Sequence, residues 1–308
     1  MSMNGSQLRV VDPILTQHAR GYTNASFIGH VLFPEVDMPT RAAKRIEFDR
    51  SSFRRRRTRR APGAPVAALE FGYEGKSVSL HQEALSAITP IEFQQEAKEV
   101  PGIDLQQLGV DTVLAVIAME KEIQQAGVAR NAASYAASNK AVLTGSDKFS
   151  DPACDTLVPI LDAKETIRAR LGRRPNTLVI TGGLVTDLQK NEKIREHFKH
   201  TTSSTITIPM LQSYYDVEQV VAGDGIYDDD TGPHDIWGSD AILAWVPPVG
   251  QRQMPLPSYG YTYRLRGHPF VEPARWDGDI RSWKNDVLDE FSAELVGPDA
   301  GFLFQGAR

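Results

Sequence analysis

The longest regular pattern in the chain is helical; it begins at Asp104 and extends to about Tyr135. Asp104 suits a helix N-cap, because its carboxylate can accept backbone N–H groups and interacts favourably with the positive end of the helix. No proline interrupts the pattern, so at roughly 1.5 Å per residue it predicts a helix of about 45–50 Å. The middle, Val113 to Met119, is apolar on every side, which predicts burial between other elements.

Residues 36–84 carry the pattern of a long two-stranded hairpin. Ile46 and Phe48 alternate with acidic residues on the outgoing side, and a second alternating run from Leu69 to Tyr73 follows the turn signal Pro62-Gly63. A period of two is typical of β-strands, and Pro-Gly pairs mark turns. An isolated hairpin is only marginally stable in water. We therefore expect this hairpin to lie on a partner surface.

The pattern over residues 155–244 predicts an α/β region. Asp162 and Glu165 resemble a capping box, which predicts a helix that opens at Asp162 and ends at Gly172. Strands are expected over residues 177–180, 217–221 and 241–246.

The end of the chain returns to an alternating pattern. Tyr259, Tyr261 and Tyr263 alternate with smaller or polar residues, which predicts a strand. Further strands are expected over residues 280–287, 291–295 and 302–304. Together they predict an antiparallel sheet whose apolar face packs on the long helix, so that this domain is discontinuous in sequence.

The first 35 residues contain short apolar clusters without helix or strand periodicity, such as Phe27-Ile28 and Val31 to Phe33. A segment of this kind gains stability by lying on another surface. That surface is either the core of the same subunit or a neighbouring chain, and the sequence leaves both interpretations open.

Composition narrows the class of protein. The chain has 308 residues, a formal net charge of -5 and a pI of about 5.8, so it is not basic overall as many nucleic-acid-binding proteins are. A single cysteine, Cys154, excludes an internal disulfide framework and is typical of a reducing compartment. The chain shows neither a signal peptide nor an apolar stretch of about 18 residues, which predicts a soluble protein made in a cytoplasm, without a membrane partner.

Seven arginines lie around the tip of the predicted hairpin: Arg50, Arg54, Arg55, Arg56, Arg57, Arg59 and Arg60. The chain also offers two acidic sets, which are Glu92, Glu96 and Glu99, and Asp228, Asp229 and Asp230. Because arginine forms bidentate pairs with carboxylates, a basic loop and acidic patches on one chain suit a protein that associates with its own copies. Two alternatives stay open, which are binding to nucleic-acid phosphates and a solvated basic loop.

Motifs for catalysis, cofactors and metals are missing from the sequence. The turn Thr181-Gly182-Gly183 lacks the third glycine of a dinucleotide site and the Gly-Lys pair of a phosphate loop. The run from Asp228 to Gly232 lacks the alternating spacing and the closing glutamate of a calcium loop. We therefore predict that the protein is not an enzyme and has no cofactor or metal site.

The order of these elements, together with several short motifs, resembles the major capsid proteins of tailed bacteriophages, which share the Hong Kong 97 fold. The resemblance covers nearly the whole chain, and its motifs gain their specificity from their order. They are Tyr22-Thr23-Asn24, Phe27-Ile28-Gly29, Leu32-Phe33-Pro34, Arg59-Arg60-Ala61-Pro62-Gly63, the helix from Asp104 with Glu120, Leu143-Thr144-Gly145, and Pro175-Asn176-Thr177-Leu178-Val179.

The resemblance implies an α+β fold of the Hong Kong 97 type. Its parts would be an N-terminal arm (1–35), an extended β-hairpin loop (36–84), a peripheral domain (85–154 and 245–308) with a spine helix (104–135) and an antiparallel sheet, and an inserted α/β axial domain (155–244). It also implies hexamers and pentamers that assemble in the host cytoplasm into an icosahedral virion shell. The shell would enclose double-stranded DNA without sequence-specific contact. Separate scaffolding, portal and decoration proteins are candidate partners.

The chain departs from the family pattern in two respects. Some members carry a scaffolding segment before the arm, whereas here the arm begins near the first residue, so scaffolding is expected to be separate or absent. Others crosslink covalently through a loop lysine and an asparagine on a neighbour. Here the loop is rich in arginine, which is a poor nucleophile; Lys44 and Lys76 lie on its arms, and Asn285 is an arbitrary candidate. We therefore expect a shell without covalent crosslinks.

Other functions remain as alternatives at the level of sequence. A nanocompartment (encapsulin-like) shell has the same fold, and the pattern does not distinguish it from a phage capsid. A nucleic-acid-binding protein would use the arginine loop and show salt-dependent binding as a soluble monomer. An α/β enzyme would need a pocket with converging titratable groups, which the sequence does not indicate.

Overall fold

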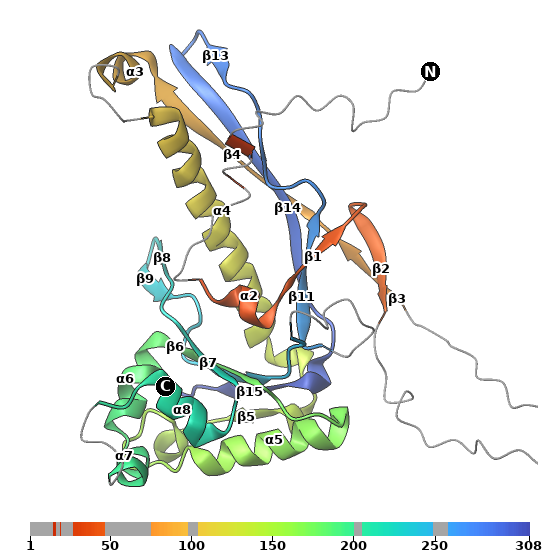
Figure 1. Ribbon diagram of the computed structural model, residues 1–308, viewed down its shortest axis with the longest axis vertical. Helices are drawn as coiled ribbons and strands as arrows, with labels where there is room; N and C mark the ends of the chain where they lie inside the picture. Colours follow the sequence, from red (N-terminus) through yellow and green to blue (C-terminus); the bar gives the residue numbers. More distant parts are fainter. Residues whose placement is uncertain are drawn as a thin grey trace, which may run out of the picture.

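The structure of the chain, a computed structural model, is an elongated molecule with two main sheets (Figure 1). It describes residues 15, 16, 19, 27–46, 75–97, 104–199, 205–248 and 258–308. A long sheet and one long helix form the upper part of the view, and a second sheet with several short helices forms the lower part. The described helices include none that is long and apolar enough to span a membrane.

The long helix α4 covers Leu105–Arg130 and joins the two parts (Figure 1). As predicted, Asp104 is its N-cap, and the carboxylate accepts hydrogen bonds from two backbone N–H groups of the first turn, at 3.0 and 3.2 Å. The helix ends at Arg130 rather than near Tyr135. It ends there because Asn131 is extended (φ -70°, ψ 98°) and opens a short 3₁₀ turn, η3, over Ala132–Ser134.

The first sheet has six strands and is antiparallel apart from one parallel pair, β1 with β11. Its strands are β1 (Glu35–Met38), β11 (Gly260–Leu265), β14 (Ser282–Leu295) and β12 (Phe270–Val271) in spatial order, with β13 (Arg275–Asp277) and β4 (His81–Pro90) also paired to β14. The two strands expected over residues 280–287 and 291–295 are one strand, β14. It continues through the buried carboxylates Asp289 and Glu290 because Arg264 and Arg41 pair with them.

One face of the first sheet packs on α4, as the sequence predicts. The contact buries Val110, Val113, Leu114 and Ile117 of the helix against Ala87, Val271, Val287 and Phe291 of the sheet. The apolar middle of α4 is nevertheless not buried on every side, because Val116 is 43% exposed. The sheet covers only one face of the helix, and a stripe at Leu108, Thr112, Val116 and Glu120 remains exposed.

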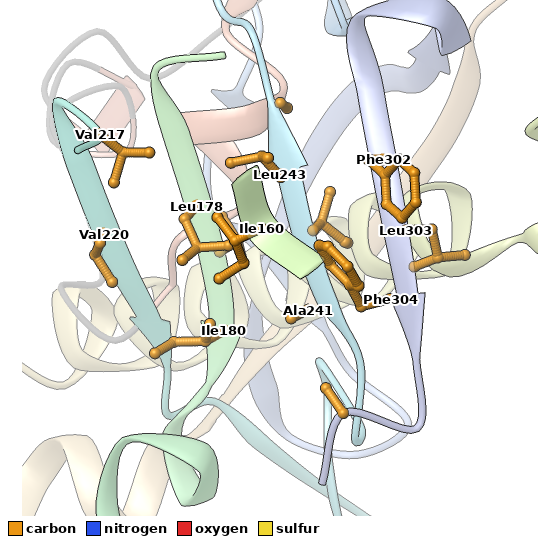
Figure 2. Close-up of a cluster of buried hydrophobic side chains, with 14 of the residues drawn as sticks. Ile160, Leu178, Ile180, Val217, Val220, Ala241, Leu243, Phe302, Leu303 and Phe304 are labelled. Carbon is orange, nitrogen blue, oxygen red and sulfur yellow. The ribbon is translucent and has the colours of Figure 1, made fainter. Parts of the chain in front are cut away.

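The second sheet has five strands, in the order β5 (Lys140–Val142), β15 (Gly301–Gln305), β10 (Ala241–Ala244), β6 (Thr177–Thr181) and β7 (Gln219–Gly223). The strand expected over residues 302–304 therefore lies here, and its placement in the antiparallel sheet of the long helix is wrong. β15 pairs antiparallel with β10 and parallel with β5. Residues Gly301 to Phe304 are all buried, which requires a position covered on both faces. Figure 2 shows Phe302, Leu303 and Phe304 beside side chains of β10 and β6.

Four helices accompany the second sheet: α5 (Leu157–Leu171), α6 (Gly182–Lys190), α7 (Glu192–Phe198) and α8 (Ile208–Tyr215). The predicted α/β character of this region is confirmed, but α5 begins at Leu157 and not at Asp162. Asp162 and Glu165 thus lie within the helix and form no capping box. The helix starts earlier because Pro159 falls in its first turn, where proline is tolerated. Its end at Gly172, with φ 70°, is as predicted.

The remaining described elements are short. They are α2 (Gly29–Leu32), α3 (Ile91–Ala97), η4 (Ala137–Asn139), η5 (Gly145–Asp147), η7 (Pro298–Ala300), and two antiparallel hairpin pairs, β2 (Ala42–Ile46) with β3 (Gly75–Ser79) and β8 (Ile226–Asp229) with β9 (Gly232–Asp235). The β2–β3 pair is the base of the predicted long hairpin. The expected return run from Leu69 to Tyr73 and the turn lie outside the described residues.

The described parts of the first segment lie on their own subunit. Ala19 is buried in the core between α4 and the first sheet, and Thr16 Oγ1 accepts a hydrogen bond from Val271 N–H at 3.0 Å. Leu32 and Phe33 belong to the larger core, which extends into the second sheet. For these residues, the interpretation of the arm as a strap on the same subunit is the one that the structure supports.

Candidate assembly surfaces

The seven arginines of the hairpin tip, Arg50, Arg54, Arg55, Arg56, Arg57, Arg59 and Arg60, lie outside the described residues, as does Glu99. The structure does describe the base of the hairpin, which Arg41 attaches to the body. The Nε and Nη2 atoms of Arg41 donate to Oε2 and Oε1 of Glu290, each at 2.7 Å. Glu290 is buried, whereas the Arg41 side chain is 63% exposed. This bidentate pair raises the pKa of Arg41 through its hydrogen bonds with Glu290 and ties the root of β2 to β14.

A row of buried and half-buried charges continues from this attachment along the first sheet. Arg264 pairs with Asp289 on β14 and with Glu35 on β1, and Lys121 of α4 donates to Glu35 at 2.6 Å. Burial opposes the ionisation of Glu35, but the charges of Lys121 and Arg264 outweigh it and hold the pKa of Glu35 below its ordinary value. The row connects β1, β11, β14 and α4, so it stiffens the body from which the hairpin projects.

Glu92 and Glu96 of the first acidic set are exposed on α3, at the distal end of the long sheet (Figure 1). Glu92 lies 3.9 Å from Arg281 in a weak, solvent-exposed pair. The carboxylates of Glu92 and Glu96 therefore remain accessible to cationic side chains of another chain.

Asp228, Asp229 and Asp230 of the second set are exposed at the tip of the β8–β9 hairpin. Asp229 is engaged within the hairpin, because it accepts hydrogen bonds from the Thr231 hydroxyl and backbone N–H at 2.6 and 2.8 Å. The hydrogen bond from the Thr231 hydroxyl is the main cause that lowers the pKa of Asp229. Asp228 and Asp230 are thus the members of this set that are better placed for a partner. The structure does not bring the two acidic sets together; α3 and the β8–β9 hairpin lie apart (Figure 1).

Exposed apolar side chains gather at the distal end of the long sheet, and sequence reasoning missed them. They are Ile88, Phe93, Leu108, Trp276 and Ile280, with exposures of 53%, 59%, 58%, 46% and 48%. α3, β13 and the start of α4 meet there (Figure 1). Exposed apolar side chains mark interaction sites where they form a patch; here they are divided between two faces, because Ile88 lines the face of the sheet away from α4, whereas Leu108 lies on the exposed side of α4. The sequence signal was present in Phe93 and Trp276, which stand among polar residues, but their position at the same end of the sheet depends on the pairing of β13 and β4 with β14.

A shallow groove follows β4 and β14 on the face of the sheet away from α4. Ala84, Ile88 and Leu288 give it an apolar floor, and Glu272 and Asp286 lie beside it. Ala84 pairs with Leu288, and residues two positions apart along a strand point to the same face of the sheet. This register explains why these side chains share a face. The groove joins apolar contact area to negative charge, which suits an extended segment that carries arginines and apolar residues.

These surfaces and the fold define a class of protein, namely a subunit of a capsid shell with the Hong Kong 97 fold. None of the known family models matches the chain. The chain is 36% identical over 305 residues to the major capsid protein of Burkholderia phage BcepMu, with 98% of each chain covered. It therefore belongs to the major capsid proteins of bacteriophages.

Solved structures agree with this assignment. A phage-related protein of Bordetella bronchiseptica RB50 has 38% sequence identity, a TM-score of 0.84 and 98% coverage of both chains. The capsid structure of cyanophage P-SCSP1u has 8% identity and a TM-score of 0.57, and the similarity covers 99% of this chain and 95% of that one. The second likeness shows the fold alone, and it is the fold of a phage capsid.

Proposed function

We propose that copies of this capsid protein associate as hexamers and pentamers into an icosahedral shell that encloses double-stranded DNA in the virion. The support is the 36% identity to a phage major capsid protein over 98% of the chain, together with exposed surfaces that are apolar, acidic and spread over the long sheet. Assembly would take place in the host cytoplasm. Separate scaffolding, portal and decoration proteins are candidate partners, and the packaged DNA would be enclosed without sequence-specific contact.

We further propose a division of the chain into an arm (1–35), an extended loop (36–84), a peripheral domain (85–154 and 245–308) and an axial domain (155–244). Two strands modify this division. β5 and β15 pair within the second sheet, so residues 140–142 and 301–308 are better assigned to the axial domain. The chain then enters and leaves that domain more than once, so several segments connect the two parts.

The arginine loop of one copy is proposed to bind the acidic surfaces of its neighbour. The described acceptors are Glu92, Glu96, Asp228 and Asp230, and the groove on the face of β4 and β14 adds Glu272 beside apolar side chains; Asp286 already pairs with Arg275 at 2.9 Å. Guanidinium groups pair with carboxylates in a bidentate manner, and many weak contacts repeated by closed symmetry hold a shell. The arm and the root of the hairpin then position the loop rather than supply most of the contact.

The first test replaces Arg54, Arg55, Arg56 and Arg57 with serine in the full chain. We expect the variant to fold as the parent does, by circular dichroism and thermal unfolding, and to form no closed shells in negative-stain microscopy. Replacement of the same four residues with lysine is the matched control; it keeps the charge and should restore part of the assembly. Normal shells from the serine variant would count against the pairing.

The shell is proposed to be held without covalent crosslinks between subunits. Asn285, the asparagine that the sequence offered, is only 1% exposed on β14, so it is not accessible to a lysine of another chain. Assembled particles should therefore run as monomers on a denaturing gel after boiling and reduction. A ladder of multimers on that gel is the outcome that contradicts this expectation.

The remaining alternatives can be separated by experiment. A protein that acts by binding nucleic acid would form salt-sensitive complexes as a monomer, and the arginine loop is where such binding would reside. A nanocompartment shell would form closed particles that hold protein rather than DNA. We favour the capsid function without enzymatic activity, because the relative that spans 98% of the chain is a phage major capsid protein.

A further inference from the structure

Glu122 is a buried carboxylate in the second half of α4, where the arm, the helix and the second sheet meet. Only 2% of the residue is exposed. A buried carboxylate is costly unless hydrogen-bond donors surround it. In the sequence it follows Glu120 and Lys121, and the local pattern does not distinguish it from its charged neighbours.

Three donors from two separate segments converge on this carboxylate. From the arm, the backbone N–H groups of Ile28 and Gly29 donate to Oε1 at 2.9 and 3.0 Å, and Gly29 N–H also lies 2.8 Å from Oε2. From the turn between β9 and β10, the buried Trp237 donates its indole Nε1–H to Oε1 at 2.6 Å. Oε1 of Glu122 therefore accepts hydrogen bonds both from the arm and from the turn that leads into β10 of the second sheet.

The residues around Glu122 are closely packed both at the arm and at the second sheet. A Cβ atom at Gly29 would lie 2.0 Å from Oε1 of Gln125 and 2.7 Å from Oε2 of Glu122. On the other side, a Cβ atom at Gly223 of β7 would lie 2.3 Å from Cδ1 of Trp237. The backbone at Gly29 and the Trp237 ring therefore lie in close contacts that a side chain at Gly29 or Gly223 would disturb.

We propose that Glu122 is a positioning residue that couples the docking of the arm to the placement of the second sheet against α4. If one segment withdraws its donors, the buried carboxylate loses partners and water must enter the junction to solvate it. Water at the junction then weakens the contact with the other segment. A displacement of the arm by a neighbouring copy would in this way reach the second sheet, and the coupling is reciprocal.

Apolar and ionic contacts also cross this junction, and the test must leave them intact. Phe27 of the arm lies near Gly225 and Ile236, and Arg130 of α4 donates to Asp240 at 2.8 Å. Trp237→Phe removes the indole donor and part of the buried ring volume, so its control must lose the same volume without losing this donor. Only the difference between this variant and a Trp→Phe control elsewhere in the core reports on the hydrogen bond to Glu122.

The experiment is hydrogen exchange followed by mass spectrometry on the full chain. Trp237→Phe should accelerate amide exchange in the arm peptide that contains Ile28 and Gly29 by about ten-fold or more. Trp245→Phe is the matched control, because Trp245 is also buried beside the second sheet but its ring faces Arg173 at 4.9 Å. The control should leave exchange in the arm unchanged.

The reciprocal variant is Gly29→Ala, which displaces the arm and should accelerate exchange around Trp237. It also serves if Trp237→Phe fails to fold. The proposal is overturned if each folded variant changes exchange only in its own segment, or if Trp245→Phe loosens the arm as much as Trp237→Phe does. None of these outcomes depends on shell formation, so they are separate from the test of the assembly function.

Discussion

At the scale of single residues, the fold depends on buried charges whose partners come from distant segments. Lys164 is buried on α5, and its Nζ donates to the backbone oxygens of Tyr215 and Asp216 at 3.0 and 2.6 Å and to Asp216 Oδ2 at 2.8 Å. These acceptors stand at the C-terminal end of α8, where a cation interacts favourably with the helix. Lys164 therefore fastens α8 to α5.

We expect Lys164→Met to lower the free energy of unfolding by about 2–4 kcal/mol, because buried acceptors lose a charged donor. Chemical denaturation of the full chain measures the change. Asp216→Asn is the control; its side chain is 80% exposed, so its loss should be smaller. Equal losses in the two variants would show that the ion pair, and not the backbone contact, dominates.

A pH dependence follows from Glu35. Its pKa lies below the ordinary value of 4.5 in the folded chain, so its stabilising contribution is complete above that value and is lost as the pH falls through the folded pKa. Glu35→Gln should reduce stability at neutral pH and flatten the loss of stability in acid. The side chain is 36% exposed, so the change should stay below about 1 kcal/mol. Unfolding curves at neutral and acidic pH test this expectation, and an unchanged acid dependence would contradict it.

The role of a residue could be predicted from the sequence where its hydrogen-bond partners are its neighbours along the chain. Asp104 caps α4 through the next turn of its own helix, so the sequence alone identified it. Glu122, Glu290 and Lys164 take their partners from segments far away in the chain. Their roles depend on tertiary contacts that no local pattern encodes.

At the scale of elements, close packing of α2 against β11 depends on Gly260. A Cβ atom there would lie 2.4 Å from Cε1 of Phe33 and 2.9 Å from the backbone oxygen of Glu294. Because Phe33 is fully buried and the second neighbour is backbone, Gly260→Ala should destabilise the subunit by about 1–3 kcal/mol. Thermal unfolding tests this, and unchanged stability would show that α2 can shift.

Gly127 offers the opposite case on α4. It is exposed in a helix, and an added Cβ atom would have no neighbour within 4 Å. Gly127→Ala should therefore raise the free energy of unfolding by about 0.5–1 kcal/mol, through helix propensity alone. The comparison of Gly127→Ala and Gly260→Ala separates the backbone effect from the steric one. Destabilisation by Gly127→Ala would mean that this face of α4 is already in contact with another chain.

Element prediction succeeded where periodicity and burial agree. The long helix and the strand at residues 177–180 had clear signals, and both are present. The placement of β15 failed because a short, fully buried strand carries no information on its neighbours. The early start of α5 was missed because a proline usually indicates the end of a helix. Pro159 lies in the first turn of α5, where proline is tolerated.

At the scale of the whole molecule, the distal apolar side chains predict a contact between copies. Phe93→Ser together with Trp276→Ser should lower the free energy of subunit unfolding only modestly, by about 1–2 kcal/mol, because both side chains are exposed and the main loss is the ring contact of Trp276 with Trp283. The double variant should give fewer closed shells by electron microscopy and light scattering. Val142→Ser, at the exposed edge of β5, is the control. Normal shell yield from the double variant would exclude the distal end as an assembly contact.

The position of β15 has a consequence for the timing of subunit production. β15 lies between β5 and β10, although its residues 301–305 are made long after both of those strands. A chain still on the ribosome thus holds β10 with one edge unpaired until Gly301–Gln305 have been synthesised. The second sheet closes only after β15 has been synthesised. A chain that has not yet made β15 therefore lacks a complete second sheet, which separates synthesis from assembly when many copies are produced together.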